Sequence, residues 1–396
     1  MTYRLHVDGD PKGAQVRINL PDGAIEVSPW PTVTPVWGRP LWESYGICSH
    51  HFNNAAYGDV DAWTQRLADM GAYAFRSGAF SKLKQVKRTA VRARELGLKW
   101  IGTLANEQAT EAELRANLDF VAANADVFIA VEGINEPDGD GLTQAEVDKT
   151  VKFQRIIRDY VDSHAELSNL VVLSPALRRP AKPELYQRFA DAGLLGTFDA
   201  VSLHHYLSGG PPDVADLREH VDMVQGEWQC GRFWITETGG TTALKSPDPR
   251  RNTEEALAAY AVRTLFEFGA DERVEFVCRY ELNDDDKPLT DNEAYFGVWR
   301  ADGTAKPEVA QIAGFTAYTR DGTAVPFVPT DVELEVDAPN NVEWKLTQVS
   351  GAAPVLWMWR PGVPHDAGPV DVTIRQPSGD QTVTVAGSAV PVLLAS

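Results

Sequence analysis

Two stretches decide the fold: VFIAVEGINEP, residues 127–137, and FWITETGG, residues 233–240. Each is an apolar run of strand length that ends in polar residues, and each places one glutamate at that end, Glu136 and Glu237. Continuous apolar runs are typical of strands buried in a parallel sheet, and α/β barrels carry their chemistry at the carboxyl ends of such strands. The two stretches therefore predict two strands of one parallel sheet, with both carboxylates at the same edge.

Between about residues 44 and 318, short apolar runs alternate with longer stretches of helical periodicity, the pattern of βα units. The predicted strands are Tyr45–Cys48, Tyr73–Arg76, Trp100–Leu104, Val127–Asn135, Leu170–Ser174, Ala200–His204, Phe233–Glu237 and Val274–Tyr280. The predicted helices are Asp61–Met70, Lys82–Leu96, Thr110–Ala123, Thr143–Ser163, Pro183–Ala192, Val214–Glu227, Thr253–Phe268 and Pro307–Tyr318. Eight such pairs predict a (β/α)₈ TIM barrel over residues 41–320. A doubly wound sheet is disfavoured because no Gly-rich phosphate turn follows the first strand, and no cofactor is indicated.

The pattern changes after the barrel. RDGTAVPFVPTD, residues 320–331, has the composition of a linker, and the following residues alternate apolar and polar side chains at period two. We therefore expect a small antiparallel β-sandwich over residues 325–396. Residues 1–40 also contain strand-like runs, which would cap the barrel or join the sandwich. Trp357 and Trp359 share one face of a predicted strand, and packing on the barrel is favoured over sugar stacking.

Composition limits the partners. The chain has 37 Lys+Arg against 56 Asp+Glu, a net charge of −19, which disfavours nucleic acid and anionic membranes and favours an uncharged substrate such as a carbohydrate. No apolar run approaches the roughly 18 residues of a membrane span, and no signal peptide is evident. We expect a soluble protein, either cytoplasmic or phage-borne and released. Three widely spaced cysteines, Cys48, Cys230 and Cys278, predict buried thiols and neither a disulfide framework nor a zinc site.

The two glutamates suit one chemistry. A retaining glycosidase needs two carboxyl groups about 5 to 5.5 Å apart, one to protonate the leaving oxygen and one to attack. Glu136 and Glu237 end the fourth and seventh predicted strands, nearly opposite each other across a barrel mouth. In these positions the NEP of residues 135–137 and the TE of residues 236–237 resemble the clan A superfamily of retaining glycoside hydrolases. The resemblance covers most of the barrel and extends to cellulase-like, xylosidase-like and glucanase members, without indicating one family.

The resemblance implies a role for each residue that matches its motifs. It implies that Glu136 is the acid/base, that Glu237 is the nucleophile, and that Asn135 hydrogen-bonds the sugar 2-hydroxyl. Such an enzyme would cleave a polysaccharide or oligosaccharide by double displacement, through a covalent glycosyl-enzyme.

Supporting residues are implied at two further strand ends. Arg76, in FRSG, matches an arginine that keeps the nucleophile ionised, and His204 and Tyr206, in SLHHY, match a pair whose tyrosine hydrogen-bonds the nucleophile. An arginine and a hydroxyl favour the charged form of Glu237. Because no fixed cation is evident beside Glu136, we expect a raised pKa there, as a general acid requires.

Other residues near strand ends are weaker candidates. Asn106, Tyr280, Glu281 and Trp299 are placed for sugar contact, but the polar two are equally well explained as solvated loop residues and the aromatic two as packing. The acidic run of residues 284–286 lacks the alternate spacing and the glycine of a calcium loop, so we expect a solvated loop and no metal site.

Two other classes of function remain open from the sequence. The first is a non-catalytic carbohydrate-binding or structural barrel, for instance a module of a larger particle; four intact candidate side chains, Arg76, Glu136, Tyr206 and Glu237, argue against it. The second is a metal-dependent hydrolase, which needs a His-x-His after the first strand, whereas the histidines at positions 50 and 51 are adjacent. Neither the sugar and its linkage, nor exo or endo action, nor the oligomeric state is indicated.

Overall fold

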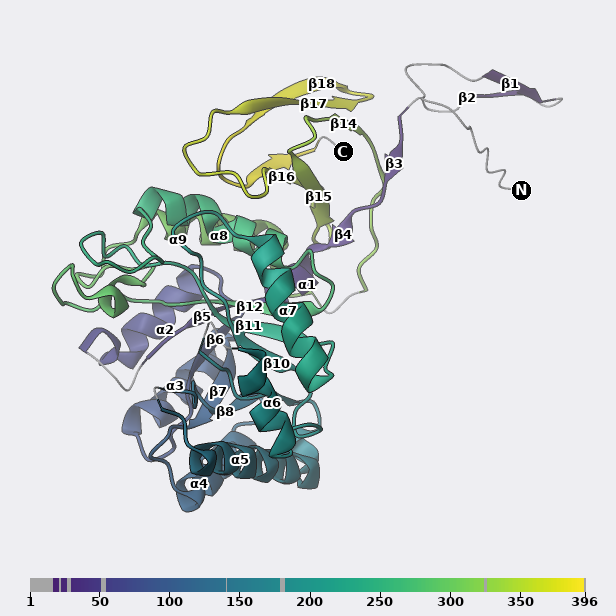
Figure 1. Ribbon diagram of the computed structural model, residues 1–396. Helices are drawn as coiled ribbons and strands as arrows, with labels where there is room; N and C mark the ends of the chain where they lie inside the picture. The colour runs from purple at the N-terminus through teal and green to yellow at the C-terminus, as the bar shows by residue number, and fades with distance from the viewer. Residues whose placement is uncertain are drawn as a thin grey trace.

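A computed structural model describes residues 17–20, 23–26, 30–50, 55–139, 141–178, 182–323 and 326–394. Its central sheet contains eight parallel strands in the order β10-β11-β12-β5-β6-β7-β8-β9. They are β5 (Tyr45–Cys48), β6 (Ala74–Gly78), β7 (Lys99–Ala105), β8 (Phe128–Ile134), β9 (Val171–Val172), β10 (Val201–His204), β11 (Phe233–Thr238) and β12 (Val274–Arg279). Parallel bridges join Leu173 to Ala200 and Leu177 to Leu203 beside β9 and β10. These bridges close the sheet, and the predicted (β/α)₈ barrel is confirmed (Figure 1).

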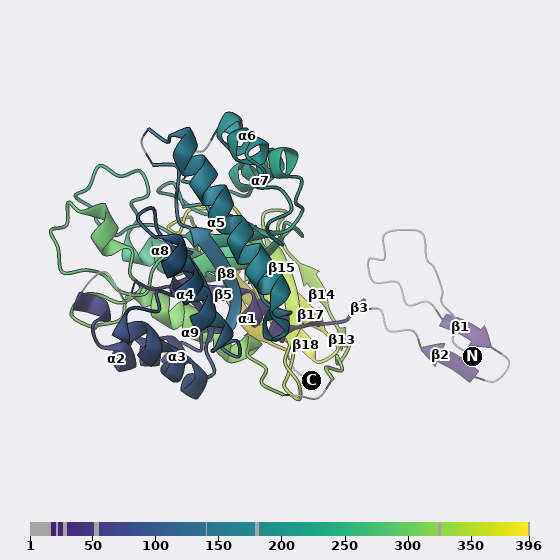
Figure 2. The same cartoon turned by 90° about the horizontal axis from the view of Figure 1, so that it is seen from below.

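A helix follows each barrel strand and lies outside the sheet (Figures 1 and 2). The helices are α2 (Val60–Asp69), α3 (Lys84–Leu96), α4 (Glu111–Ala122), α5 (Gln144–Ser163), α6 (Pro183–Asp191), α7 (Val214–Trp228), α8 (Glu254–Phe268) and α9 (Pro307–Thr319). Thr110 and Thr143 precede α4 and α5 as N-caps and form capping boxes. In each, the threonine hydroxyl accepts from the backbone N–H of a glutamate three residues ahead, and that glutamate's side chain accepts from the threonine backbone N–H. Local signals of this kind explain why the predicted helices lie where the structure has them.

The barrel interior is a packed core, so a substrate can reach the strands only at their ends. A layer of mainly small side chains fills it, with the Trp234 and Phe276 rings stacked 4.7 Å apart. Cys48 and Cys278 are free, buried thiols in this layer, as predicted, whereas Cys230 is partly exposed.

The C-terminal residues form a small β-sandwich with its own apolar core. One sheet has the order β19-β16-β15-β4 and the other β14-β17-β18, with β13 paired to β3. Their bounds are β3 (Thr32–Val33), β4 (Val36–Trp37), β13 (Val332–Glu333), β14 (Glu335–Asp337), β15 (Glu343–Gln348), β16 (Val355–Trp359), β17 (Val370–Gln376), β18 (Gly379–Val385) and β19 (Val390–Leu393). The N-terminal strands β3 and β4 thus pair with sandwich strands before the short helix α1 (Gly38–Glu43) leads into the barrel.

A separate hairpin, β1 (Arg17–Leu20) with β2 (Gly23–Glu26), lies apart from the barrel and the sandwich in both views (Figures 1 and 2). The rest of the predicted N-terminal strand segment, residues 1–16, 21–22 and 27–29, lies outside the described residues.

The sandwich packs on the barrel helices α8 and α9 (Figure 1). Trp359 stacks on Phe266 of α8 with centroids 4.7 Å apart, and Trp357 contacts Phe315 of α9 at 5.7 Å. Arg263, fully buried on α8, donates to the Val363 and Gly387 carbonyl oxygens at 2.8 and 2.6 Å. The two tryptophans therefore pack, as we favoured.

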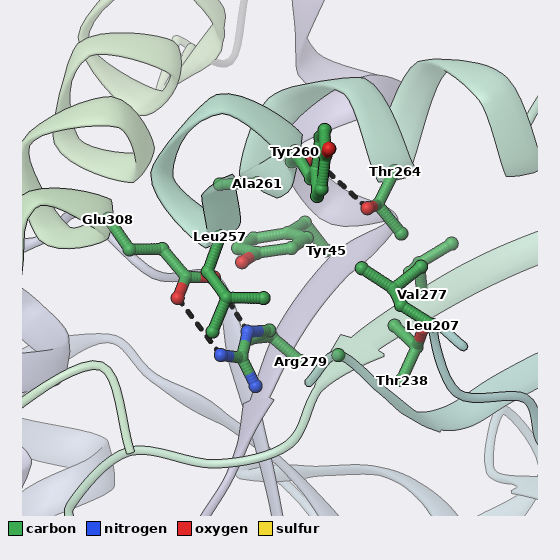
Figure 3. A pocket seen from close by; sticks show the side chains of 11 residues that line it. Tyr45, Leu207, Thr238, Leu257, Tyr260, Ala261, Thr264, Val277, Arg279 and Glu308 are labelled. Carbon is green, nitrogen blue, oxygen red and sulfur yellow. Dashed lines mark hydrogen bonds and ion pairs between the residues drawn. The ribbon is translucent and has the colours of Figure 1, made fainter. Parts of the chain in front are cut away.

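Arg279 ties the last barrel strand to the last helix. Its Nε and Nη2 donate to the Glu308 carboxylate at 2.6 and 2.9 Å, beside a cavity of about 10 Å³, no larger than one water molecule (Figure 3). Gly239, which follows β11 with φ 133°, lies so close that an added Cβ would sit 2.3 Å from Arg279 Nη1. Glycine is required there, and the chain just after Glu237 is held tightly against β12.

Candidate active site

Polar side chains from four strands of the barrel meet at its carboxyl end. Arg76 lies in β6, Asn135 and Glu136 follow β8 directly, His204 ends β10, and Glu237 is the next-to-last residue of β11. Parallel strands end at the same edge of the sheet, which is why residues up to 161 positions apart come together.

The two glutamates form a close pair. One oxygen of Glu136, one of Glu237 and a ring nitrogen of His204 all lie within 4.8 Å of one another. The Glu237 side chain is 6% exposed and that of Glu136 is 23% exposed. The buried carboxylate therefore lies deep in the mouth, and the more exposed one lies at its opening.

Glu237 accepts hydrogen bonds on both oxygens. Arg76 Nη1 donates to Oε1 at 2.7 Å, and the Tyr206 hydroxyl donates to Oε2 at 2.5 Å. His204 Nδ1 lies 3.3 Å from the same Oε2. Burial and the Glu237 charge raise the pKa of Tyr206 well above its ordinary value, so its hydroxyl keeps its hydrogen and acts as a donor.

Arg76 is itself held from below by a carboxylate that the sequence analysis missed. Glu132, within β8 and fully buried, accepts from Arg76 Nε at 2.8 Å and from the Ser202 hydroxyl at 2.7 Å. Burial lowers the pKa of Arg76, but the charges of Glu132 and Glu237 outweigh it and raise that pKa well above the ordinary value. A charged residue inside an otherwise apolar strand was the available signal.

Glu136 differs from the sequence prediction. Its Oε1 lies 2.7 Å from His204 Nδ1, and its Oε2 accepts from Arg178 Nε at 3.1 Å. Burial acts to raise the pKa of Glu136, but His204 and Arg178 lower it by more. The resulting pKa is about 2. The expected raised pKa is wrong for this conformation, because His204 and the Arg178 guanidinium, from the loop after β9, together outweigh the effect of burial. No sequence motif indicated Arg178.

The backbone at Glu136 is also unusual. Its φ is 45°, a left-handed conformation that is uncommon for a residue with a side chain. Its N–H donates to the Ala176 carbonyl oxygen at 3.0 Å, which fixes the bend to the neighbouring loop. Strained residues of this kind concentrate at functional sites.

Asn135 lies beside the carboxylate pair. Its side-chain oxygen accepts from Arg76 Nη2 at 2.6 Å, which orients the amide and leaves its NH₂ to donate elsewhere. With Arg76 and Glu237 it lines a cleft of about 270 Å³. Asn106, which is exposed, also lines this cleft, and its side chain accepts from the backbone N–H of Gln108 at 3.1 Å.

The two aromatic candidates, Tyr280 and Trp299, lie in different surroundings. Tyr280 lies at the site, edge-on to His50 at 5.2 Å and to Tyr206 at 5.9 Å. The ring of Trp299 instead packs against the barrel core and under the Arg66 guanidinium, 5.2 Å from its centroid. The structure therefore brings Tyr280 to the carboxylates and places Trp299 in a packing contact.

Acidic residues after β12 are more buried than expected. Glu281 is buried and accepts from the Tyr57 hydroxyl at 3.0 Å, and burial raises its pKa well above the ordinary value. Asp284, 2% exposed, forms an ion pair with Lys306 at 2.8 Å. The expected solvated loop is wrong at Asp284, because the lysine that begins α9 reaches back beneath the loop.

The spacing of Glu136, His204 and Glu237 would by itself suit a metal ion. The neighbours of His204 argue otherwise. His204 Nε2 faces Arg76 Nη2 at 3.5 Å, and since arginine only donates, we assign the ring hydrogen to Nδ1, which faces the carboxylates. A protonated nitrogen cannot ligate, and hydrogen bonds account for the arrangement.

No protein-family model and no curated protein sequence matches the chain. Its fold is similar to those of solved glycoside hydrolases. A family 39 glycoside hydrolase from the gut symbiont Bacteroides cellulosilyticus has a TM-score of 0.64 at 13% identity, covering 91% of this chain and 82% of that one. A monomeric β-xylosidase from Caulobacter crescentus has a TM-score of 0.56 at 15% identity, covering 86% and 80%. A family 17 β-1,3-glucanosyltransferase from Rhizomucor miehei has a TM-score of 0.51 at 18% identity, covering 67% and 96%.

These likenesses confirm the barrel fold. At such identities the chemistry must be argued from the site itself. Among the residues that the structure describes, none of the helices combines the length and apolar character needed to cross a membrane.

Proposed function

We propose that this chain is a retaining O-glycoside hydrolase that acts on a polysaccharide or oligosaccharide. The spacing of the two carboxylates carries the proposal: oxygens of Glu136 and Glu237 lie within 4.8 Å. An inverting pair stands roughly 6.5 to 9.5 Å apart to leave room for a water molecule, whereas a retaining pair is about 5 to 5.5 Å apart. The short spacing favours direct attack on the sugar by one of the carboxylates.

The reaction would run in two displacements. In the first, a Glu237 oxygen bonds to the anomeric carbon while Glu136 gives its proton to the departing glycosidic oxygen. In the second, Glu136 takes a proton from water, the water oxygen bonds to the anomeric carbon, and the ester to Glu237 breaks. Glu136 is protonated again and Glu237 is free as a carboxylate, so both groups return to their starting states.

The surroundings of each carboxylate support this assignment of roles. Glu237 receives N–H and O–H donors from Arg76 and Tyr206, which favour the ionised form that a nucleophile needs. Glu136 lies nearer the opening, where a leaving group or a water molecule can exchange a proton with it. Asn135, whose oxygen is occupied by Arg76, would present its NH₂ to the sugar 2-hydroxyl.

The test uses the full chain and a panel of aryl glycosides that varies gluco, galacto, xylo and arabino sugars in pyranose and furanose forms. We expect Glu237→Gln to lower kcat by at least about 10³-fold on the sugar that the wild type cleaves. Glu166→Gln, the same change at an exposed site away from the mouth, should keep wild-type activity.

Two further readouts decide the mechanism. A fluorosugar of the accepted type should leave its mass on a peptide containing Glu237, and NMR of the first-formed anomer should show retention. Inversion, or near wild-type turnover by Glu237→Gln, would contradict the mechanism. Binding of oligosaccharides with no product over days would instead favour a non-catalytic barrel.

A further inference from the structure

Arg178 contacts the segment that carries Glu136 through both its side chain and its backbone. Its Nε donates to Glu136 Oε2 at 3.1 Å, and its backbone N–H donates to Asp138 Oδ1 at 2.8 Å. The residue lies in the loop after β9, just beyond the bridge between Leu177 and Leu203 that closes the barrel. Its side chain is 57% exposed, so it reaches the carboxylate from the solvent side of the mouth.

We propose that Arg178 is a positioning residue that holds Glu136 as a carboxylate turned toward His204, and that Arg178 must withdraw before Glu136 can carry a proton to the leaving group. The inference rests on the proposed retaining function and adds to it the group that controls the charge of the acid/base.

The geometry of the two carboxylate oxygens carries this inference. Oε1 faces the Nδ1 hydrogen of His204 at 2.7 Å, and Oε2 accepts from Arg178. A carboxylic acid has a hydrogen on one oxygen, and that hydrogen cannot face another donor. Protonation of Glu136 therefore breaks one of the two contacts.

Of the two contacts, the one with Arg178 is the one that can give way. His204 is 1% exposed and is fixed between Glu136, Glu237 and Arg76. Arg178 is more than half exposed, and solvent can take over its hydrogen bonds when it swings out. A sugar that enters beside Glu136 would meet this guanidinium first.

Several charges bear on Glu136, and Arg178 is the exposed cation among them. His204 and Arg178 contact its carboxylate, Glu237 and Arg76 lie behind His204, and Asp138 follows on the same loop. Burial raises the pKa of Asp138, and the Glu136 charge adds to the rise. The pKa of Glu136 is about 2, with His204 and Arg178 as the groups that lower it.

Removal of Arg178 should therefore shift two pH-dependent transitions to higher pH, one in kcat/KM and one in kcat. For a substrate with a poor leaving group, kcat/KM falls as Glu136 loses its proton in the free enzyme. For a dinitrophenyl glycoside, which needs no acid, kcat rises as Glu136 becomes a base in the glycosyl-enzyme. Without the cation both transitions should move to higher pH, by about one unit.

The experiment compares the wild type, Arg178→Ala and Arg178→Lys on phenyl and dinitrophenyl glycosides of the sugar found in the panel. We expect both limbs to move up in Arg178→Ala and to stay within a few tenths of a unit in Arg178→Lys. Arg115→Ala removes an exposed arginine that pairs with Glu111 on the same helix, α4, and it controls for loss of surface charge. A lower rate with unmoved limbs would overturn the inference and indicate a merely structural role.

A second measurement does not need turnover. The protein carries Glu237→Gln and is labelled with ¹³C at its glutamate carboxyl carbons. The NMR signal of Glu136 is identified by its loss when Glu136→Gln is added. Its titration is then followed with and without Arg178→Ala. An unchanged midpoint would refute the role of Arg178 whether or not the substrate is known. An inactive wild type would contradict the proposed function, whereas active wild type with unmoved limbs would contradict the role of Arg178 alone.

Discussion

Replacing Tyr206 with phenylalanine removes one hydroxyl from the site and keeps the ring. That hydroxyl donates to Glu237 Oε2 at 2.5 Å, and the carboxylate it touches is 6% exposed. The bond gives the carboxylate a buried donor and fixes the direction of its lone pairs. Ring contacts with Tyr280 and Phe296 at 5.9 and 5.6 Å, and with the Arg250 guanidinium at 5.0 Å, do not involve the hydroxyl.

The size of the effect follows from the charge of the acceptor. A hydrogen bond to a charged group contributes about 1.5 to 3 kcal/mol. At about 1.4 kcal/mol for each factor of ten, Tyr206→Phe should lower kcat/KM by about 10- to 150-fold. Because the ring packing is kept, the urea midpoint of unfolding should change little.

The assay is steady-state hydrolysis of a dinitrophenyl glycoside, with urea unfolding measured on the same preparations. Tyr160→Phe is the matched control, because it removes a hydroxyl that donates to Asp119 at 2.7 Å on the protein surface. A Tyr206→Phe enzyme within twofold of the wild type would refute the reasoning. So would an equal loss in Tyr160→Phe.

Two further predictions concern stability. Arg263→Met should lower the free energy of unfolding, measured in urea, by about 3 to 5 kcal/mol. The substitution leaves Glu267, also fully buried, without its ion-pair partner at 2.8 Å. A loss under 1 kcal/mol would show that the pair contributes little. Burial lowers the pKa of His50 from 6.5 to about 4, so the unfolded chain takes up the proton first as the pH falls. Stability should therefore decline from about pH 6.5 toward pH 4, and His50→Gln should flatten that decline in urea midpoints measured at pH 7 and pH 5; equal slopes in both proteins would contradict this.

The barrel could be predicted because its signals are local. Apolar runs such as Phe233–Thr238 and caps such as Thr110 and Thr143 lie within the segments that they define. The fifth strand shows the limit: only Val171–Val172 is regular, and single bridges on either side complete the closure. Its pairing depends on the neighbouring strands more than on its own residues.

The site residues also differ in whether local sequence signals could predict them. Arg76 and Tyr206 contact Glu237, and each could be anticipated from its own strand end. Arg178 could not, because it comes from a loop and its carboxylate partner lies 42 residues earlier in the chain. Trp299 could not be decided from its place near a strand end, because the Arg66 guanidinium that lies over its ring comes from a distant helix, α2.

His204 explains how one site can serve two carboxylates with different tasks. Nε2 faces Arg76, so Nδ1 carries a hydrogen in either charge state of the ring, and that hydrogen lies 2.7 Å from Glu136 and 3.3 Å from Glu237. In the proposed mechanism Glu237 loses its charge when the ester forms, at the moment when Glu136 becomes the base. A donor already nearer Glu136 stabilises that new carboxylate without any movement of the buried ring. The same donor opposes protonation of Glu136 in the free enzyme, so Arg178, the exposed partner, is the contact through which substrate binding can change the charge of the acid/base.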